Sequence, residues 1–564
     1  MIMFDVVSSA DISRTRASPD ENASTLRPRC LAAPAPTRCS TTSPSRRWTT
    51  AAGRPPAPPP AAGAVEIAER FCFFGVSFNL ISYLTGPLGV GLAKAASAIN
   101  IWNGVGQLLP LLGAALADSW LGRYRTILLA SLLYILGLAM LALSTLLSSG
   151  SYKCGTAGST PCPPPSGLQM AAFYTSLYTV AVAQAGHKPC VQAFGADQFD
   201  ESDPREAISR SSFFNWWYFS ICAGTAVMLV FLIYIQDNVG WGLGFGILCI
   251  AMALALGVFL LGTRTYRYCA VSSDSKHLAR AFAAWRNIRR RKSTSAPLEE
   301  AEQELLISGN AADLLEEAKS VLRLFPIWAT CLIYAVAFSQ SSTFFTKQAA
   351  TLDRRVGHGG LQVPPAALQS FMSITIVIIM PVYDRVIVPL ARRYTGVSSG
   401  VTMLQRIGAG KLLSLVSEVV AALVETRRLR VATDAGLVDK PEVALPMSLW
   451  WMVPQYVLVG AADVFAMVGM QEFFYDQVPD KMRSLGLALY LSIFGIGSFI
   501  SSGLVSGVDR ATSASGQSWL SDNLNRGHLD YFYWLIAALS ALELLAYVFY
   551  ALLFKYKEKT VTAD

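Results

Sequence analysis

Three ionisable side chains, Glu66, Glu69 and Arg70, stand near the start of a long apolar stretch. Their spacing of i, i+3 and i+4 places them on one face of a helix. A charge at the middle of a bilayer costs about 2.5–3.5 kcal/mol on insertion scales, and more without a partner. Inside a membrane span they must therefore pair beside a hydrated cavity, which indicates transport or proton relay. The alternative is a helix end at the membrane surface, with the charged groups reaching the headgroups.

The composition predicts an integral membrane protein. Of the 564 residues, 53% are hydrophobic and only 15% are charged, which is too apolar for an ordinary soluble chain. The net charge of +8 does not indicate nucleic-acid binding, because the basic residues lie in particular connections rather than on one domain. The ten cysteines show no CxxC pair and no Cys/His metal spacing, so no metal or other cofactor is expected.

Long apolar segments recur from Ala64 onward, and the polar stretch 264–322 divides them into two sets of six. We therefore predict an all-α integral membrane fold of twelve transmembrane helices, with six-helix bundles over 63–263 and 323–555. The predicted spans lie near 64–85, 98–117, 126–148, 168–192, 212–235, 241–262, 324–346, 365–390, 399–424, 447–470, 484–507 and 530–554.

Three segments fall outside the bundles. Residues 1–62 are rich in Pro, Arg and Ser, which predicts a disordered tail. Their four acidic residues argue against an organelle transit peptide. The linker 264–322 either contains an amphipathic helix at the inner headgroup plane or is a plain solvated connector. Residues 556–564 form a short C-terminal tail.

Lys and Arg are concentrated in the even-numbered connections, which predicts that both termini are cytosolic. The connection 425–445, which is rich in arginine, goes against this trend. The orientation places the 149–167 loop outside. There, Cys154 and Cys162 either form a disulfide or remain two free thiols. The plasma membrane and the vacuolar membrane are both consistent with this topology.

A short turn between the second and third spans carries Asp118 and Arg123 within Gly113–Arg125. It resembles the loop signature of the major facilitator superfamily, whose two bundles rock around a central site. The resemblance implies that Asp118 and Arg123 take part in gating. An ordinary charged turn explains the charges but not the placement of the glycines. By contrast, Gly408–Lys411 is not a phosphate loop, because the first glycine and the final Ser/Thr of that motif are missing.

Longer motifs identify a narrower family. Glu66–Phe71 resembles the ExxER(F/Y) motif of proton-coupled oligopeptide transporters. The resemblance covers roughly 64–555 and points to the plant branch, the nitrate and peptide transporter family. It implies a secondary active transporter rather than an enzyme, and no convergent nucleophile, base or metal set is visible. Further matching segments are Gly186–Asp200, Phe213–Phe219, Tyr383–Arg385, Gln471–Gln477, Met482–Ser484 and Leu529–Trp534.

The chain departs from the family pattern where substrates are recognised. Peptide carriers of the family have paired tyrosines where Phe73 and Phe74 stand, and an arginine in place of Ser77. Their seventh-span acid is missing, since Leu324–Gln348 contains no Asp or Glu. Some nitrate carriers have a histidine at the position of Phe338. The resemblance implies a small anionic or amphipathic solute such as nitrate, a short peptide, a plant hormone or a specialised metabolite. The differences count against classical di- and tripeptides and give nitrate no support, and Phe73 and Phe74 favour a solute less polar than a peptide.

The resemblance implies proton symport. Glu66 and Glu69 are the predicted proton carriers, poised between Arg70, which favours their charged forms, and burial, which favours the neutral forms. Protonation would weaken their hold on Arg70 or Lys188, and the freed cation could then take an anionic group of the substrate. Lys188 and Asp463 are expected to pair between the bundles in one conformation, as a gate. The predicted substrate-binding residues are Lys188, Phe73, Phe74, Ser77, Phe338, Gln340 and Asp463.

Two further hypotheses concern regulation and packing. Ser293 follows a basic run in the linker, where a kinase could phosphorylate it; the alternative is a basic stretch that touches anionic membrane lipid. His187 is one residue from Lys188, about 100° around the helix, and is expected to pack away from the cavity. A transport-inactive sensor or scaffold on the same fold remains the alternative function.

Overall fold

The computed structural model describes most of the membrane part of the chain. The predicted residues Asp118, Cys154, Cys162 and Ser293, and most of the 1–62 tail and the 264–322 linker, lie outside the described part. The described residues are 40–41, 60–117, 121–147, 166–196, 198, 225, 231–264, 266–268, 320–356, 361–395, 401–478, 483–514 and 518–556.

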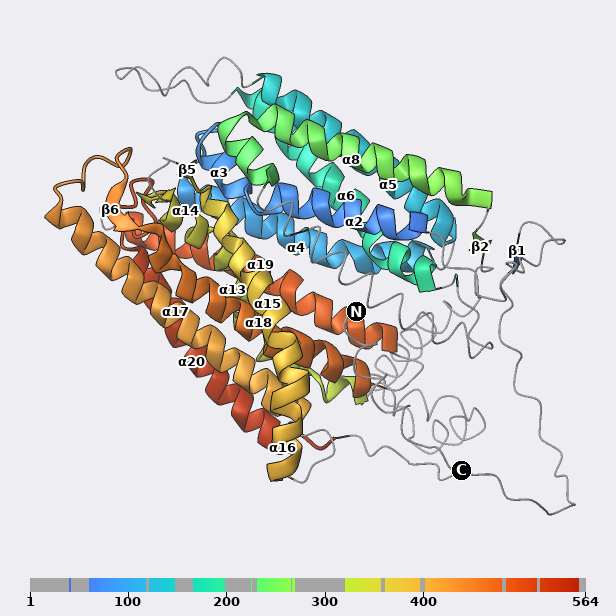
Figure 1. The fold of residues 1–564 in the computed structure, drawn as a ribbon. Coiled ribbons are helices and arrows are strands. Elements are labelled where there is room, and N and C mark those ends of the chain that lie inside the picture. Colours follow the sequence, from blue (N-terminus) through green and yellow to red (C-terminus); the bar gives the residue numbers. More distant parts are fainter. Residues whose placement is uncertain are drawn as a thin grey trace, which may run out of the picture.

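The N-terminal half is a bundle of helices (Figure 1). The predicted first span is broken, because α2 ends at Ser77 and α3 begins at Leu80. The buried Asn79 fills this break and donates from Nδ2 to Asp237 Oδ1 at 2.8 Å. The helices are α2 (Pro60–Ser77), α3 (Leu80–Thr85), α4 (Leu92–Leu116), α5 (Arg123–Leu147), α6 (Gly167–Ala196) and α8 (Trp241–Leu261), followed by η3 (Gly262–Arg264).

The C-terminal half is a second bundle. The predicted seventh span is divided into short helices, and two parts of it meet at a bend of 43° near Thr330 and Cys331. The helices are α12 (Phe325–Ala329), α13 (Leu332–Ser339), η5 (Gln340–Ser342), α14 (Phe344–Ala350), η6 (Pro365–Gln369), α15 (Ser370–Val382), η7 (Tyr383–Ile387), α16 (Val388–Thr395), α17 (Met403–Asp434), η8 (Leu449–Met452), α18 (Val453–Asp476), α19 (Arg483–Ser513) and α20 (Leu529–Leu553).

In the described part of the chain, strands form only short pairs. β3 (Leu352–Asp353) runs parallel to β6 (Leu445–Ser448). The antiparallel pairs are β1 (Ser40–Thr41) with β2 (Arg267–Tyr268), and β4 (Arg355–Val356) with β5 (Leu361–Gln362).

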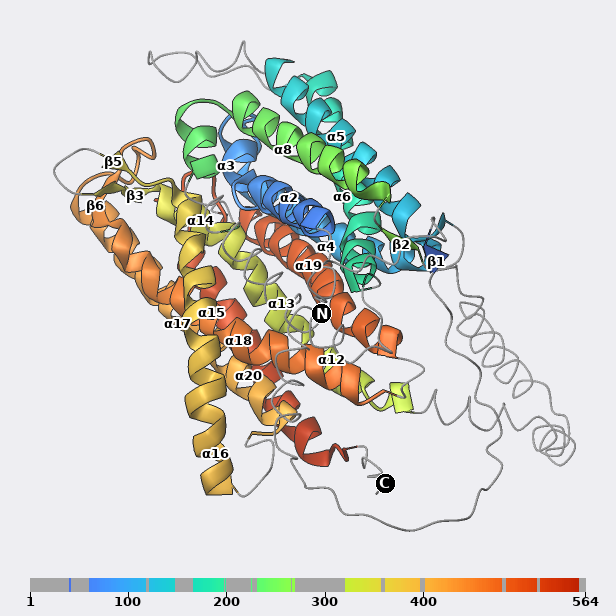
Figure 2. The same ribbon diagram turned by 45° about the vertical axis from the view of Figure 1, so that its right-hand side comes forward.

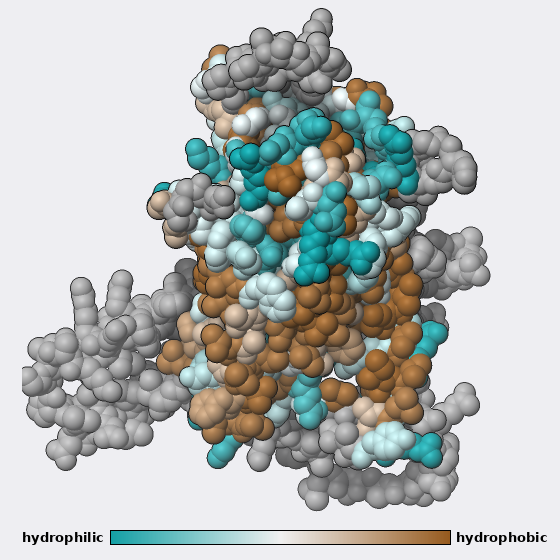
Figure 3. Space-filling model, turned by 90° about the vertical axis from the view of Figure 1, so that its left-hand side faces the viewer, coloured by the Kyte–Doolittle hydropathy of each residue, from teal (hydrophilic) through white to brown (hydrophobic). Residues whose placement is uncertain are grey.

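The all-α membrane fold is confirmed. Seven helices of the described part are long and apolar enough to span a membrane, or eight when the bent pair is counted as one span. The predicted count of twelve is not fully confirmed. The helices of the predicted first, second and fourth spans, α2, α4 and α6, are not among these candidate spans, and the predicted fifth span is described only at residue 225 and from residue 231 onward. Exposed apolar side chains cover much of the lower part of the face shown in Figure 3, with polar side chains above them. These side chains suit a surface that faces lipid.

The arginines of the 425–445 segment correct the orientation argument. α17 continues to Asp434, so Arg428 lies on the helix and not in a connection. Its Nη2 atom lies 2.7 Å from Glu425 Oε1, and both side chains are completely buried. Arg428 also donates from Nη1 to Asn525 Oδ1 at 2.7 Å. This arginine is therefore a structural cation rather than a topology signal.

The two bundles pack against each other mainly through α4 and α19, which lie side by side between them in Figures 1 and 2. Glycines permit this approach. A Cβ atom added to Gly104 would lie 3.0 Å from the Gly495 carbonyl oxygen and 2.9 Å from the Phe499 ring. Small residues at such a crossing let helix backbones come close inside a membrane.

Candidate transport site

The predicted charged group on α2 is assembled as its spacing indicates. Arg70 Nε donates to Glu66 Oε1 at 2.9 Å and lies 3.4 Å from Glu69 Oε2. The exposed fractions of the Glu66 and Glu69 side chains are 1% and 0%. The two carboxylates are therefore enclosed by protein and Arg70 is mostly buried, which argues against the alternative of a helix end at the headgroups.

Lys188 lies on α6, near enough to Glu69 for the two opposite charges to attract each other. Its hydrogen bond, however, goes from Nζ to Gln107 Oε1 of α4 at 2.7 Å. Sequence reasoning missed Gln107. A polar amide in the middle of an otherwise apolar span is the signal that could have identified it. The half-buried ammonium is therefore held by a neutral acceptor close to the carboxylates.

His187 packs away from this group, as predicted. Its Nε2 atom lies 2.7 Å from Ser131 Oγ of α5, and its ring meets the Tyr134 ring edge-on at 6.1 Å between centroids. The side chain is completely buried.

The aromatic residues that follow Arg70 have different surroundings. Phe73 is buried and stacks on Trp102 of α4, with 5.4 Å between ring centroids. Phe74 is half-buried and stacks on Phe78 at 4.9 Å. Ser77, at the end of α2, is buried. Phe73 therefore contributes mainly to packing within the N-terminal bundle, and Phe74 is the more accessible of the pair.

On the C-terminal side, Asp463 of α18 accepts a hydrogen bond at 2.7 Å from the Tyr334 hydroxyl of α13. Phe338 meets the Phe494 ring at 5.9 Å. Gln340 Nε2 donates to Ser501 Oγ of α19 at 3.2 Å. These predicted residues thus line the region where α13 packs against α18 and α19.

The structure does not pair Lys188 with Asp463 in this conformation. Lys188 bonds Gln107 and Asp463 bonds Tyr334, each within its own bundle. The predicted gate between the bundles therefore remains a prediction for another conformation. Arg123, a predicted gating residue, begins α5, while Asp118, the other residue of that predicted gating turn, lies outside the described part.

An intramembrane ion pair that sequence reasoning missed lies in the C-terminal bundle. Lys411 Nζ of α17 is 3.1 Å from Glu543 Oε2 of α20 and also donates to the Thr330 carbonyl. The other oxygen of Glu543 accepts the Ile333 backbone N–H at 2.9 Å. The carboxylate therefore caps the first turn of α13 at the break in the seventh span. A lysine and a glutamate in two different spans were the available signal.

Hydrogen bonds between the bundles gather at the end where α4 begins and α19 ends. Asn100 Nδ2 donates to Ser501 Oγ at 2.9 Å, and Ser97 Oγ lies 2.6 Å from Ser502 Oγ. The Leu92 backbone N–H donates to Asp522 Oδ1 at 2.6 Å. The bundles are thus joined at this end.

Comparisons with known proteins agree on one family. The chain matches the POT family, PTR2, over residues 124–520. It is 55% identical to NRT1/PTR FAMILY 5.10 of Arabidopsis thaliana over 509 residues, which cover 86% of this chain and 90% of that protein. It is 47% identical to NRT1/PTR FAMILY 5.13 of the same plant over 527 residues, which cover 88% and 92%.

Solved structures share the fold. An auto-inhibited POT family peptide transporter superposes with a TM-score of 0.70 at 22% identity, covering 90% of this chain and 99% of that one. A POT family transporter in complex with 5-aminolevulinic acid gives a TM-score of 0.63 at 16% identity, covering 90% and 98%. The described helices, the family match and these relatives lead to one conclusion: the chain is a multi-pass membrane transporter that belongs to the plant NRT1/PTR branch of the POT family.

Proposed function

We propose that the chain is a proton-coupled symporter of a small anionic or amphipathic solute. The observation that carries the proposal is the buried group formed by Glu66, Glu69 and Arg70, with Lys188 close by. Ionisable groups inside a membrane bundle are costly and rare, and they commonly mark an ion or substrate pathway.

The coupling follows from competition for one cation. While Glu66 and Glu69 are ionised, they hold Arg70 at 2.9 Å and 3.4 Å. Adding a proton to either carboxyl removes a charge from this pair and frees Arg70 for an anionic group. Lys188 is held by the neutral Gln107 amide, so it can move to a substrate without first leaving a carboxylate. Proton and substrate binding thus favour each other.

Two features support the substrate class. Phe74 offers a half-buried aromatic surface one helical turn along α2 from Arg70, which suits a solute with an apolar part. The seventh span has no Asp or Glu between Leu324 and Gln348. The amino group of a peptide would therefore lack the carboxylate that pairs with it in peptide carriers. The neighbour crystallised with 5-aminolevulinic acid shows that its own fold holds a small carboxylate-bearing molecule.

The conformation supports alternating access. With both termini cytosolic, the end at which Asp522 contacts Leu92 faces outside, so this structure is closed to the outside. The proposed location is the plasma membrane or the vacuolar membrane.

Phosphorylation of Ser293 in the linker would change how readily the bundles rock, because a phosphate offsets nearby arginine and lysine charges.

Substrate-dependent proton current in voltage-clamped cells tests the proposal. A screen of small organic anions at acidic outside pH should find at least one that evokes an inward current. Glu69→Gln should abolish accumulation against a gradient while leaving the protein in the membrane. Glu442→Gln is the matched control, because Glu442 is exposed in a connection. Uptake by the Glu69→Gln variant that still follows the proton gradient would contradict the mechanism. Absence of any transport would revive the sensor alternative, which family membership does not favour.

A further inference from the structure

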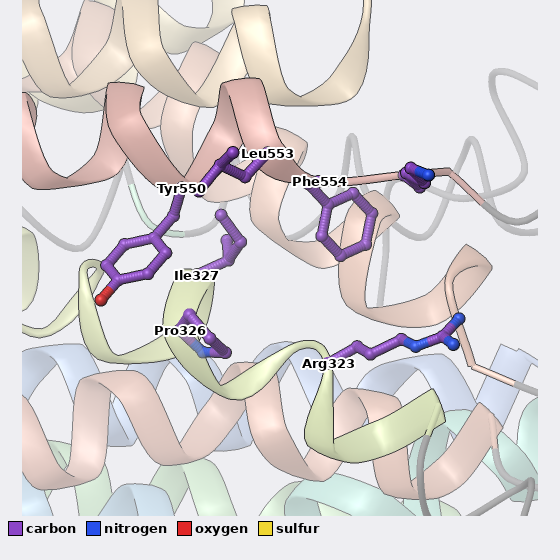
Figure 4. Close-up of a pocket in the computed structure, with 7 residues that line it drawn as sticks. Arg323, Pro326, Ile327, Tyr550, Leu553 and Phe554 are labelled. Atoms are coloured by element: carbon purple, nitrogen blue, oxygen red, sulfur yellow. The ribbon is translucent and has the colours of Figure 1, made fainter.

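A cavity of about 420 Å³ lies between the ends of α12 and α20, apart from the charged group on α2 (Figure 4). Pro326 and Ile327 of α12 form one wall, and Tyr550 and Leu553 of α20 form the opposite one. The full lining is Arg323, Pro326, Ile327, Tyr550, Leu553, Phe554 and Lys555.

The apolar walls continue onto a surface that suits lipid chains. The exposed fraction of Leu553, at the end of α20, is 62%, and that of Leu322, just before α12, is 56%. Both helices belong to candidate membrane spans, Ser320–Ala329 with its bent partner and Leu529–Leu553. The cavity is therefore open to the position where acyl chains meet the protein.

Two cations mark the polar end of the cavity. Arg323 precedes the first residue of α12, and Lys555 follows the last residue of α20 by two positions. Both side chains are exposed. Neither forms an ion pair with any described carboxylate. Because each stands at the end of a span, both lie at the level of the headgroups. Tyr550 adds the aromatic ring that is typical of this level.

We propose that this cavity binds one anionic phospholipid. The phosphate lies between Arg323 and Lys555, and an acyl chain follows Ile327 and Leu553. Charge complementarity selects the ligand, because a zwitterionic lipid brings no net charge to two cations that pair with none of the described carboxylates. In the proposed orientation this end faces the inner leaflet, where anionic lipids are enriched.

The bound lipid would brace the seventh and twelfth spans. α12 is separated from α13 by the 43° bend, and Glu543 of α20 caps α13 just beyond it. A lipid that touches both α12 and α20 adds a second connection between the same two elements. The lipid site does not depend on proton coupling, so the two proposals fail separately.

The test is native mass spectrometry of the full-length protein after delipidation, titrated with phosphatidylglycerol or phosphatidylcholine. The Arg323→Gln/Lys555→Gln double variant should bind phosphatidylglycerol about 30-fold more weakly, since each basic residue contributes about a fivefold factor near an anionic headgroup. The matched control is Arg392→Gln/Arg393→Gln, which removes two exposed charges from α16. A charge-conserving variant, Arg323→Lys/Lys555→Arg, should bind as the parent does.

Four results decide the proposal. Preferential phosphatidylglycerol binding that only the charge-removing variant loses supports it. Equal binding of phosphatidylcholine, or equal loss in the α16 control, overturns it. Competition by glycerol phosphate at concentrations similar to the lipid would show a free-phosphate site and also overturns it. If the double variant is not monodisperse, Lys555→Gln alone decides, because Lys555 lies beyond the last helix, and about fivefold weaker binding is then expected.

Discussion

Asp522 caps a helix that belongs to the other bundle. α4 begins at Leu92, and its N-cap residue, Gly91, has no side chain to accept the first backbone N–H groups. Asp522 Oδ1 accepts the Leu92 N–H at 2.6 Å instead. A Cβ atom on Gly91 would lie 3.1 Å from that same oxygen, so the glycine leaves room for the carboxylate. The cap exists only while this end of the bundles is closed.

Removing the carboxylate should therefore open this end rather than unfold the protein. Loss of an N-cap costs about 0.5–2 kcal/mol, and loss of a negative charge at a helix N-terminus costs about 0.3–1 kcal/mol. The sum has a middle value of about 2 kcal/mol, which corresponds to a shift of about 30-fold toward the open conformation in Asp522→Ala. Asp522→Asn keeps an acceptor but loses the charge, so a shift of only about two- to fivefold is expected.

Distances between spin labels measure this shift. Lys94 of α4 and Arg510 of α19 are both exposed near this end, and each can carry a label in a background without reactive native cysteines. The parent should show a dominant short distance, and Asp522→Ala should transfer population to a longer one. Asp439→Ala is the control, because Asp439 pairs with Arg526 inside the C-terminal bundle. An unchanged distribution in Asp522→Ala, or the same change in the control, would refute the reasoning.

Three other predictions concern the buried ion pair, the predicted gate and His187. Lys411→Ala should destabilise the protein by about 3–5 kcal/mol because it leaves Glu543 buried and unpaired. In thermal unfolding, Lys411→Met/Glu543→Leu should lose less stability than Lys411→Ala, and equal losses of stability would argue against a paired role. Lys188→Ala and Asp463→Ala should each impair uptake, with the double variant less impaired than the product of the singles; independent effects would exclude the predicted gate. His187→Ile should leave the pH midpoint of uptake unchanged, since the ring faces Ser131; a shifted midpoint would give the histidine a sensing role.

Local spacing explains what the sequence alone determined. Apolar segments of span length determined the membrane fold, because the bilayer requires helices of that length with internally satisfied backbones. The i, i+3 and i+4 spacing of Glu66, Glu69 and Arg70 determined their pairing, because helix geometry brings such residues together whatever surrounds the helix. The direction of His187 also followed from the 100° step between consecutive residues.

The tertiary structure decided which distant residues became partners. Gln107 meets Lys188 across 81 positions, and Glu543 meets the α13 backbone across 210. Such contacts depend on how helices pack and where they break, and no periodicity within one helix specifies either. The break near Thr330 is an example, because the 324–346 segment is apolar throughout and predicts an unbroken span. A charged residue in a membrane span predicts that a partner is needed, but the packing of the helices determines which residue that partner is.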